Sequence, residues 1–402
     1  MIWTATPLKS SDLPALGLFF KKHYTALGLY GNMAHFQWKI LENPVMPGLI
    51  NLVKDDDGKI ISTTSVTPKR LLLKGEEYKV AEIGDTYTDP AYQKKGLFAL
   101  LINHYVEDFC RSKPDGAKLI YGFPNERSLP PYIHRCGFEI FDKLGLAEFE
   151  RSILRTPSSA MKAALRWMFR TKCQTSSRFC LCTDILKTTA EIDRLWSESQ
   201  DKEKYLLKKD GTWWQWRYNR ATEGYKTYAM REEGSKRFLA YIVVKVRWGR
   251  RLRYVQLCDI FGDTSDHAVT AFRHFVQTMV LPIDTFLLWA HPALKLADAA
   301  IDEGFVKERD VPVIFFKNQA YERLSESCQS RSNCPWRFRQ CMKVCLWTLY
   351  KQSRRLRLKL GKKAVCRRWQ VFLPRDTFLK NLYETAKTGS KATCGIPDPK
   401  NH

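Results

Sequence analysis

Four sequence landmarks occur twice along this chain, in the same order and at similar spacing. The pairs are Trp38 with Trp216, Asp85 with Asp259, Pro124 with Pro292, and Gly137-Phe138 with Gly304-Phe305. Successive landmarks lie 47, 39 and 13 residues apart in the first set and 43, 33 and 12 in the second. This agreement favours an internal duplication, with units near residues 1–150 and 183–320, over two unrelated domains. A chain of 402 residues is also longer than a domain with a single hydrophobic core usually is.

The first unit alternates helix and strand signals in an order typical of a mixed α/β layer. Leu13, Leu16 and Phe20 recur at helical spacing within residues 10–30. The predicted strands are Leu49–Val53, Ile60–Thr67, Arg70–Leu73, Tyr78–Tyr87, Lys118–Gly122 and a last one after Gly137-Phe138. Further helices are predicted after Gly96 and after Asn125. We therefore expect an α/β fold with two related mixed-sheet domains.

A glycine-containing loop separates the long predicted strand from the helix that follows. It reads Gln93-Lys94-Lys95-Gly96 and leads into Leu97-Phe98. Consecutive amides at a helix start form an anion site, which the helix dipole strengthens. Gly96 lets a phosphate approach the backbone closely, and the two lysines add positive charge. Taken alone, the same letters also fit an ordinary turn with solvated lysines.

With their surroundings, residues 36–150 resemble a GCN5-related N-acetyltransferase (GNAT) domain. The loop Gln93–Phe98 is similar to the pyrophosphate loop of that family, except that Phe98 stands where Gly or Ala is usual. The next strand and Asn125 resemble the family's second motif, which closes with Gly137-Phe138. Over about 300 residues, the chain also looks like two-domain acetyltransferases found with surface-polysaccharide genes.

The resemblance implies acetyl transfer from acetyl-CoA to a primary amine, with an amino sugar of a polysaccharide precursor as one acceptor. It implies no metal. The residues that would bind the donor are Thr86, Tyr87, Thr88, Gln93, Lys94, Lys95, Gly96, Leu97, Phe98 and Asn125. The three residues at the strand end would contribute mainly their peptide groups, which contact the pantetheine arm and the thioester carbonyl.

Three side chains are candidates for proton transfer. Glu82 and Asp85 are the nearest carboxylates, and they point to opposite faces of a regular strand. A bulge near Gly84 would change that relation. Asp85 is favoured as the base, although its repetition as Asp259 equally fits a structural hydrogen-bonding role. Tyr132 is the candidate acid, and a packed aromatic ring is the alternative.

The second unit lacks the phosphate loop. After Asp259 it carries Asp263 and Asp266 where a pyrophosphate would lie, and like charges repel. We therefore expect one donor site per chain. The second unit then either completes the acceptor cleft, which Trp38, Trp214 and Trp216 would line, or only stabilises the first unit.

The net charge of +24 is concentrated in two stretches. Residues 151–182 hold seven Lys and Arg, residues 331–372 hold thirteen, and neither holds an acidic residue. Amphipathic patterns at 158–172 and 335–360 predict basic helices that either bind an anionic membrane surface or pack on the protein. We divide the chain into 1–150, a linker at 151–182, 183–320, a basic extension at 321–384 and a disordered tail at 385–402.

Two other functions remain open. FemABX-like aminoacyltransferases use a tandem fold of this kind with charged tRNA, and the cations suit a nucleic acid, although the phosphate loop ranks tRNA second. A non-catalytic adaptor that docks through its basic helices is the third. The twelve cysteines form no CxxC pair, so no zinc site is predicted. The start shows no signal-peptide pattern, so we expect a cytoplasmic protein that acts in solution or at the inner face of the membrane.

Overall fold

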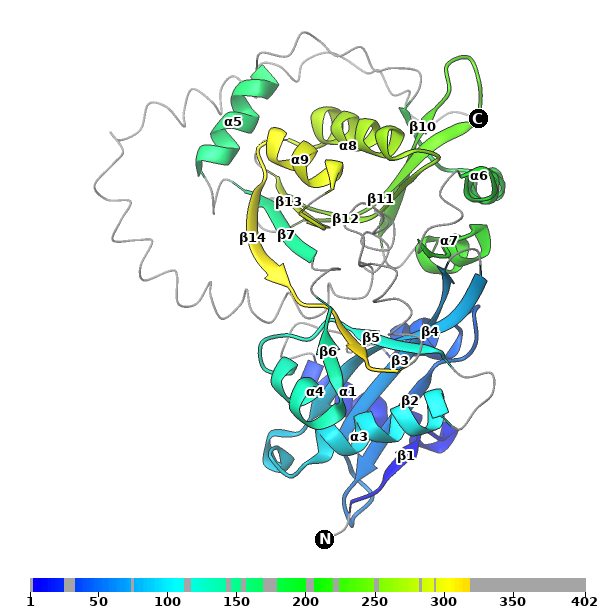
Figure 1. Ribbon diagram of the computed structural model, residues 1–402, viewed down its shortest axis with the longest axis vertical. Helices are drawn as coiled ribbons and strands as arrows, with labels where there is room; N and C mark the ends of the chain where they lie inside the picture. The colour runs from blue at the N-terminus through cyan, green and yellow to red at the C-terminus, as the bar shows by residue number, and fades with distance from the viewer. Residues whose placement is uncertain are drawn as a thin grey trace, which may run out of the picture. The chain divides into compact units, whose positions relative to one another are not determined.

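Two mixed β-sheets organise the described part of the chain (Figure 1). The structure, a computed structural model, describes residues 3–24, 33–73, 76–111, 117–141, 146–152, 157–168, 179–199, 206–219, 224–248, 253–281, 284–292 and 294–318. All of them lie within the unit Met1–Leu349. The predicted extension at 321–384, its 335–360 helix and the tail at 385–402 lie outside the described residues.

The first sheet has the order β1-β2-β3-β4-β5-β15-β6. Its strands are β1 (Ala5–Pro7), β2 (Leu49–Lys54), β3 (Ile60–Leu73), β4 (Glu76–Thr88), β5 (Leu119–Gly122), β6 (Phe138–Ile140) and β15 (Ile314–Phe316). The helical segments of this half are η1 (Ser10–Asp12), α1 (Leu13–Tyr24), α2 (Met33–Phe36), η2 (Gln37–Leu41), η3 (Pro90–Tyr92), α3 (Leu97–Tyr105), η4 (Val106–Arg111) and α4 (Leu129–Cys136). A short strand, β9 (Leu206–Leu207), also pairs with β3.

The second sheet repeats this plan in the order β8-β10-β11-β12-β13-β7-β14. Its strands are β7 (Leu146–Arg151), β8 (Phe179–Leu181), β10 (Tyr225–Arg231), β11 (Phe238–Trp248), β12 (Arg253–Gly262), β13 (Thr285–Ala290) and β14 (Val306–Val311). Its helices are α5 (Pro157–Met168), α6 (Ile185–Glu198), α7 (Gly211–Tyr218), α8 (Ser265–Met279) and α9 (Lys295–Asp302). The expected fold, α/β with two similar mixed sheets, is confirmed.

Each sheet is completed by a strand from the other half of the chain. β15, near the end of the described chain, lies between β5 and β6 and pairs with both. β7, which follows the first half, lies between β13 and β14 of the second sheet. Neither sheet is therefore complete without a segment that the sequence pattern assigned to the other unit.

A pair of tryptophans links the two halves reciprocally. Trp38 Nε1 donates to the carbonyl of Trp216 at 3.0 Å, and Trp216 Nε1 donates to the carbonyl of Trp38 at 3.3 Å. Their rings lie 5.3 Å apart, and the Arg217 guanidinium lies over the Trp38 ring. These residues belong to the first pair of repeated landmarks. They pack against each other, and Trp214 is buried as well.

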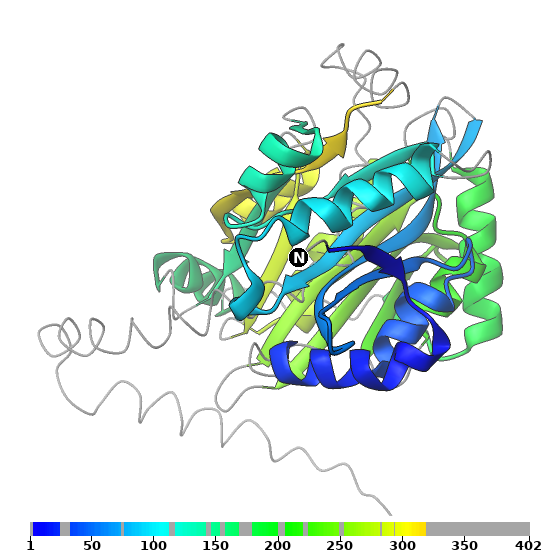
Figure 2. The same cartoon turned by 90° about the horizontal axis from the view of Figure 1, so that it is seen from below.

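Helices cover both faces of the first sheet (Figure 2). Ile50 and Leu52 of β2 pack with Leu16 and Phe20 of α1. The neighbouring Val53 packs in a different cluster, with Leu97 and Leu101 of α3. This alternation follows from the two-residue period of a strand. The candidate site lies on this sheet, and its two faces carry different parts of it.

Two predicted elements differ from the observed ones. The strands predicted at Ile60–Thr67 and Arg70–Leu73 form one strand, β3, that runs through Pro68. Proline is tolerated there because the β2 ladder ends opposite Val66, so an N–H at position 68 has no β2 partner to bond. The helix predicted over 10–30 begins as η1 and continues as α1 to Tyr24, and residues 25–32 lie outside the described residues.

The strand exchange predicts that a residue near position 314 stabilises a sheet formed by residues before 141. Replacing Ile314, which is fully buried, with alanine should lower the free energy of unfolding by about 2–5 kcal/mol. Hydrogen exchange of the β5 amides should accelerate correspondingly. Ile140→Ala on adjacent β6 is the control, because Ile140 is 42% exposed and should change stability by only about 0.5 kcal/mol. Unchanged β5 protection in Ile314→Ala would contradict the exchanged topology.

Candidate functional site

The central strands β4 and β5 separate part of the way along the first sheet. Their parallel pairing runs from Val80↔Leu119 to Ile83↔Gly122, and β4 then continues to Thr88. A Cβ atom at Gly122 would lie 2.9 Å from the Ile83 side chain, so glycine permits this last close pairing. Beyond it, in the part of the chain that the structure describes, no β5 residue pairs with β4. The separation opens one edge of β4 at Gly84–Thr88.

A bulge lies where the strands separate. The β3–β4 register passes from Ser65↔Gly84 to Thr63↔Tyr87, so Asp85 and Thr86 together face Thr64. Asp85 has φ of 49°, an uncommon backbone conformation for a residue with a side chain. The bulge predicted near Gly84 is thus present. It brings the side chains of Glu82 and Asp85 to the same face of the sheet, because each contacts a residue on the odd-numbered face of β3 (Lys69 and Ser65).

Asp85 is held by two neighbours. Lys39 Nζ donates to Asp85 Oδ2 at 2.6 Å, and Ser65 Oγ donates to the same oxygen at 3.0 Å. The side chains of Lys39 and Asp85 are 8% and 7% exposed, so this is a buried ion pair. Burying both charges is tolerated because each has its partner. Lys39 comes from η2, directly after Trp38.

Glu82 lies in a more enclosed position. It forms an ion pair with Lys69, and the Tyr121 hydroxyl donates to its Oε2 at 3.2 Å. Both charged side chains are 6% exposed. Glu82 pairs with Tyr121 in the β4–β5 ladder, below the point of separation. Of the two predicted carboxylates, Asp85 is therefore the one beside the open edge of β4.

The opposite face of the bulge carries hydroxyl groups. Thr86 and Thr64 hydroxyls lie 2.7 Å apart, as do those of Thr88 and Ser62. The Tyr132 side chain, from α4, lies beside Thr86. Burial raises the pKa of Tyr132 far above its usual value, and the neighbouring Thr86 hydroxyl offsets part of that rise. Tyr132 is therefore protonated at neutral pH.

The predicted acid is packed between aromatic rings. Tyr132 makes edge contacts with Phe98 of α3, at 4.9 Å between ring centroids, and with Phe138 of β6, at 5.0 Å. Phe98, the residue that departs from the usual loop, thus supports Tyr132. The sequence alternatives, acid or packed aromatic, are both compatible with this position. Tyr87, by contrast, points to the α1 side, where it packs against Phe19 and His23.

The predicted phosphate loop forms the start of α3. Asp89 caps η3 through a hydrogen bond from the Ala91 amide, and Gln93 Nε2 donates to the Thr88 carbonyl at 3.2 Å. Lys94 and Gly96 both have positive φ, of 64° and 82°. Gly96 is the N-cap of α3, and a Cβ built on it meets no atom within 4 Å. The helix start therefore faces open space, as an anion site requires.

The remaining predicted donor residues hold the loop and its neighbour in place. Leu97 is buried among β2 and β3 side chains, and Lys95 lies exposed with its Nζ over the Tyr92 ring. Asn125 Oδ1 accepts from the amides of Arg127 and Ser128 in the turn before α4. The side-chain amide oxygen of Asn125 is thus already hydrogen-bonded within this turn.

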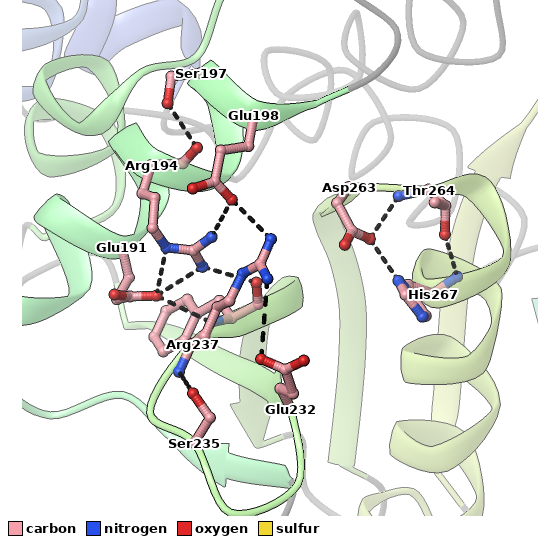
Figure 3. Close-up of polar contacts among 11 residues, drawn as sticks. Glu191, Arg194, Ser197, Glu198, Glu232, Ser235, Arg237, Asp263, Thr264 and His267 are labelled. Carbon is pink, nitrogen blue, oxygen red and sulfur yellow. Dashed lines mark hydrogen bonds and ion pairs between the residues drawn. The ribbon is translucent and has the colours of Figure 1, made fainter.

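The corresponding helix start in the second sheet is filled by its own side chains (Figure 3). Thr264 Oγ1 accepts from the His267 amide at 3.2 Å, while Asp263 Oδ1 accepts from the Thr264 amide and contacts His267 Nδ1. A Cβ on Gly262 would lie 2.8 Å from the Thr264 carbonyl and 3.0 Å from the Ala268 amide. Amides at this helix start are thus already engaged by its own side chains, and the Asp263 carboxylate would repel a phosphate. The predicted difference between the two units has a structural basis.

Figure 3 also shows an ion-pair network beside this helix start. Arg194 of α6 forms ion pairs with Glu191 and Glu198. Arg237, the residue directly before β11, forms ion pairs with Glu198 and Glu232. Arg194 additionally donates to the Phe238 carbonyl at 3.0 Å. The network fastens α6 to the β10–β11 hairpin and is structural.

Two kinds of feature are absent from the described residues. No three or more His, Cys, Asp or Glu side chains are grouped so that they could hold a metal ion. Within the same residues, no helix combines the length and the apolar character needed to cross a membrane.

The partners of the two carboxylates were not predicted from the sequence. Lys39, Lys69, Ser65 and Thr64 complete the site from η2 and β3. One signal was available: the run from Ser62 to Ser65 places four polar residues in the middle of a predicted strand, and all four are buried. Buried polar side chains need partners, so such a run indicates a polar neighbour.

Comparison with known proteins identifies this region. Residues 21–141 match a family described as acetyltransferase (GNAT) domain. This segment contains β4, the bulge and the loop at Gln93–Phe98. A sequence comparison with curated proteins gives no match.

Solved structures share the fold over most of the chain. A GCN5-related N-acetyltransferase from Anabaena variabilis is 15% identical with a TM-score of 0.56, and a probable N-acyltransferase from Enterococcus faecalis is 15% identical with a TM-score of 0.57. Each match covers 78% of this chain and 72% of the other. N-myristoyltransferase from Saccharomyces cerevisiae with bound myristoyl-CoA is 11% identical, with a TM-score of 0.53 over 78% and 82% of the two chains. The domain match and the shared fold support an acyltransferase.

The contrast between the two helix starts predicts one acyl-CoA site per chain. Calorimetric titration with acetyl-CoA should give a stoichiometry of one, and Gly96→Asp should weaken binding at least about tenfold, because a carboxylate would replace and repel the pyrophosphate. Gly234→Asp is the matched control, since Gly234 also has positive φ and open space around its Cα. Two equivalent sites, or equal effects of both substitutions, would contradict this assignment.

Proposed function

We propose that this protein transfers an acetyl group from acetyl-CoA to a primary amine, and that its acceptor is an amino sugar of a surface-polysaccharide precursor. The open helix start at Gly96, beside the separated edge of β4, is the observation that carries the proposal. The match of residues 21–141 to an acetyltransferase domain supports it. The two-domain acetyltransferases of polysaccharide gene clusters, which the sequence resembles, supply the choice of acceptor.

The donor is assigned to the first sheet. The amides around Gly96 and the side chains of Lys94 and Lys95 receive the pyrophosphate, because they combine helix-start N–H groups with positive charge. The open edge of Thr86–Thr88 receives the pantetheine arm in the manner of an added strand. Asn125 lies in the turn between α4 and β5, the strand that separates from β4. This arrangement directs the thioester carbonyl toward the bulge.

The reaction needs two proton transfers. The amine nitrogen attacks the thioester carbonyl carbon, a C–N bond forms, and the C–S bond then breaks. We propose that Asp85 accepts the amine proton, because its carboxylate lies beside the open edge of β4. Glu82, by contrast, lies where β4 and β5 are still paired. Lys39 and Ser65 fix the orientation of that carboxylate. Positioned carboxylates of this kind serve as general bases.

The leaving thiolate takes its proton from Tyr132. The hydroxyl lies beside Thr86, on the face of β4 toward α3 and α4, and its raised pKa keeps it protonated until the thiolate forms. Asp85 and Tyr132 are thus on opposite faces of the bulge. The base and the acid are separated by the strand along which the donor lies.

The second sheet is assigned a supporting role. Its helix start is closed by Asp263 and Thr264, and β7 and β15 join it to the first sheet. We propose that it completes the acceptor side without binding a donor. The loop at Gln93–Phe98 favours acyl-CoA over aminoacyl-tRNA as donor and catalysis over an adaptor role.

The function is tested by incubating the full chain with acetyl-CoA and a panel of amines, namely amino-sugar nucleotides, a polyamine and a lysine peptide. Mass spectrometry should show one acetyl group added to an amino sugar, with an equal amount of free CoA. Asp85→Asn should lower this turnover about 100-fold or more. Acetylation of the peptide alone would refute the acceptor class. Salt-sensitive tRNA binding without any CoA binding would refute the donor.

Removal of the Tyr132 hydroxyl should separate catalysis from binding. Tyr132→Phe is expected to lower kcat about 100-fold and to change the acetyl-CoA Kd less than about twofold, because the ring contacts remain. Tyr105→Phe is the matched control: Tyr105 is also fully buried, and its hydroxyl donates to the Leu49 carbonyl away from the bulge. Equal kcat values for the two variants would show that Tyr132 only packs.

A further inference from the structure

Among the α5 side chains that the structure describes, two small ones are buried and two large apolar ones are exposed. Ser159 and Ala160 are 4% and 3% exposed. Met161 and Leu165, four residues apart on one face, are 62% and 43% exposed, and Lys162 beside them is exposed. The sequence left two possibilities for this amphipathic helix, packing on the protein or contact with a membrane. Met161 and Leu165, the two members of the apolar face whose side chains the structure describes, are exposed.

The base of this helix is firmly attached. α5 begins six residues after β7, which is paired on both sides within the second sheet. Arg151, the last residue of β7, donates to the carbonyls of Glu303 and Leu281, each at 3.5 Å. Leu281 itself is 44% exposed. The helix is therefore connected to a fixed part of the fold, with a further exposed apolar side chain at that attachment.

All charged residues in and around this helix are cationic. Beyond the buried Arg151, residues 152–182 contain six Lys and Arg and no acidic residue. Such a stretch is attracted to anionic lipid by about 1 kcal/mol for each cation near the surface. An exposed apolar face with flanking cations is the composition of helices that lie in a membrane interface.

We propose that α5 docks this protein onto an anionic membrane surface, with Met161 and Leu165 inserted among the lipids and Lys162 at the headgroups. The other basic stretch of this chain, residues 331–372, is also cationic, so it lacks the charge that would complement α5. A nucleic acid would satisfy the cations but would leave the two apolar side chains in water. The proposal does not depend on which reaction the protein catalyses.

The proposal is tested by sedimentation of the full chain with vesicles of phosphatidylglycerol and phosphatidylcholine, and with vesicles of phosphatidylcholine alone. Binding is expected only to the anionic vesicles. The double variant Met161→Asp, Leu165→Asp should bind the anionic vesicles at least about tenfold more weakly. Lys162→Glu should bind them at least about fivefold more weakly, because it reverses one charge at the headgroups. High salt should weaken binding of the unaltered chain.

The matched control is Leu186→Asp, since Leu186 is 79% exposed on α6. All three variants change exposed residues, so their unfolding temperatures should equal that of the unaltered chain, which circular dichroism checks. Equal binding to neutral vesicles, or equal vesicle binding by the double variant and the Leu186→Asp control, would overturn the proposal. The proposal would also be overturned if the double variant lost dimer formation or tRNA binding while it still bound vesicles.

Discussion

The pairing of β15 between β5 and β6 and of β7 between β13 and β14 is the constraint on which the rest of this structure depends. Buried backbone N–H and C=O groups must be paired, and in each sheet the pairing is supplied by the other half of the chain. The two sheets consequently form together. The reciprocal Trp38 and Trp216 hydrogen bonds reinforce the same relation at a second place.

The bulge in β4 converts a regular strand into a site. It changes the side-chain alternation so that Glu82 and Asp85 share a face, while Thr86 turns toward Tyr132. Its energetic cost, a positive φ at Asp85, is offset by the buried contacts with Lys39 and Ser65. A related register shift occurs in the β11–β12 ladder, where Val243 pairs with Asp259 and Val244 with Leu257, so Cys258 of β12 is the extra residue. The neighbouring Asp259 is bound by Lys209 at 2.8 Å. The same backbone device thus occurs in both sheets, and what differs is the helix start that follows it.

That difference is the basis of the proposed donor position. At Gly96 the positive φ and the open space leave the α3 start accessible, whereas Thr264 and Asp263 occupy the α8 start. A helix start has only a few amides to offer, so a side-chain cap and a phosphate compete for them. The second sheet has the same scaffold without an open helix start, and for this reason we propose a single donor position in a chain of two similar halves.

The sequence by itself determined the α/β fold, the repeated order of landmarks and the loop at Gln93–Phe98, because these depend on local periodicity, turn residues and spacing. It also indicated a bulge near Gly84. Only the tertiary structure revealed the exchange of β7 and β15, because the pairing of short strands depends on contacts between residues far apart in the chain. For the same reason it alone assigned Lys39 to Asp85 and placed Tyr132 beside Thr86. Likewise, periodicity predicted the two faces of α5, but only packing decided that Met161 and Leu165 face outward.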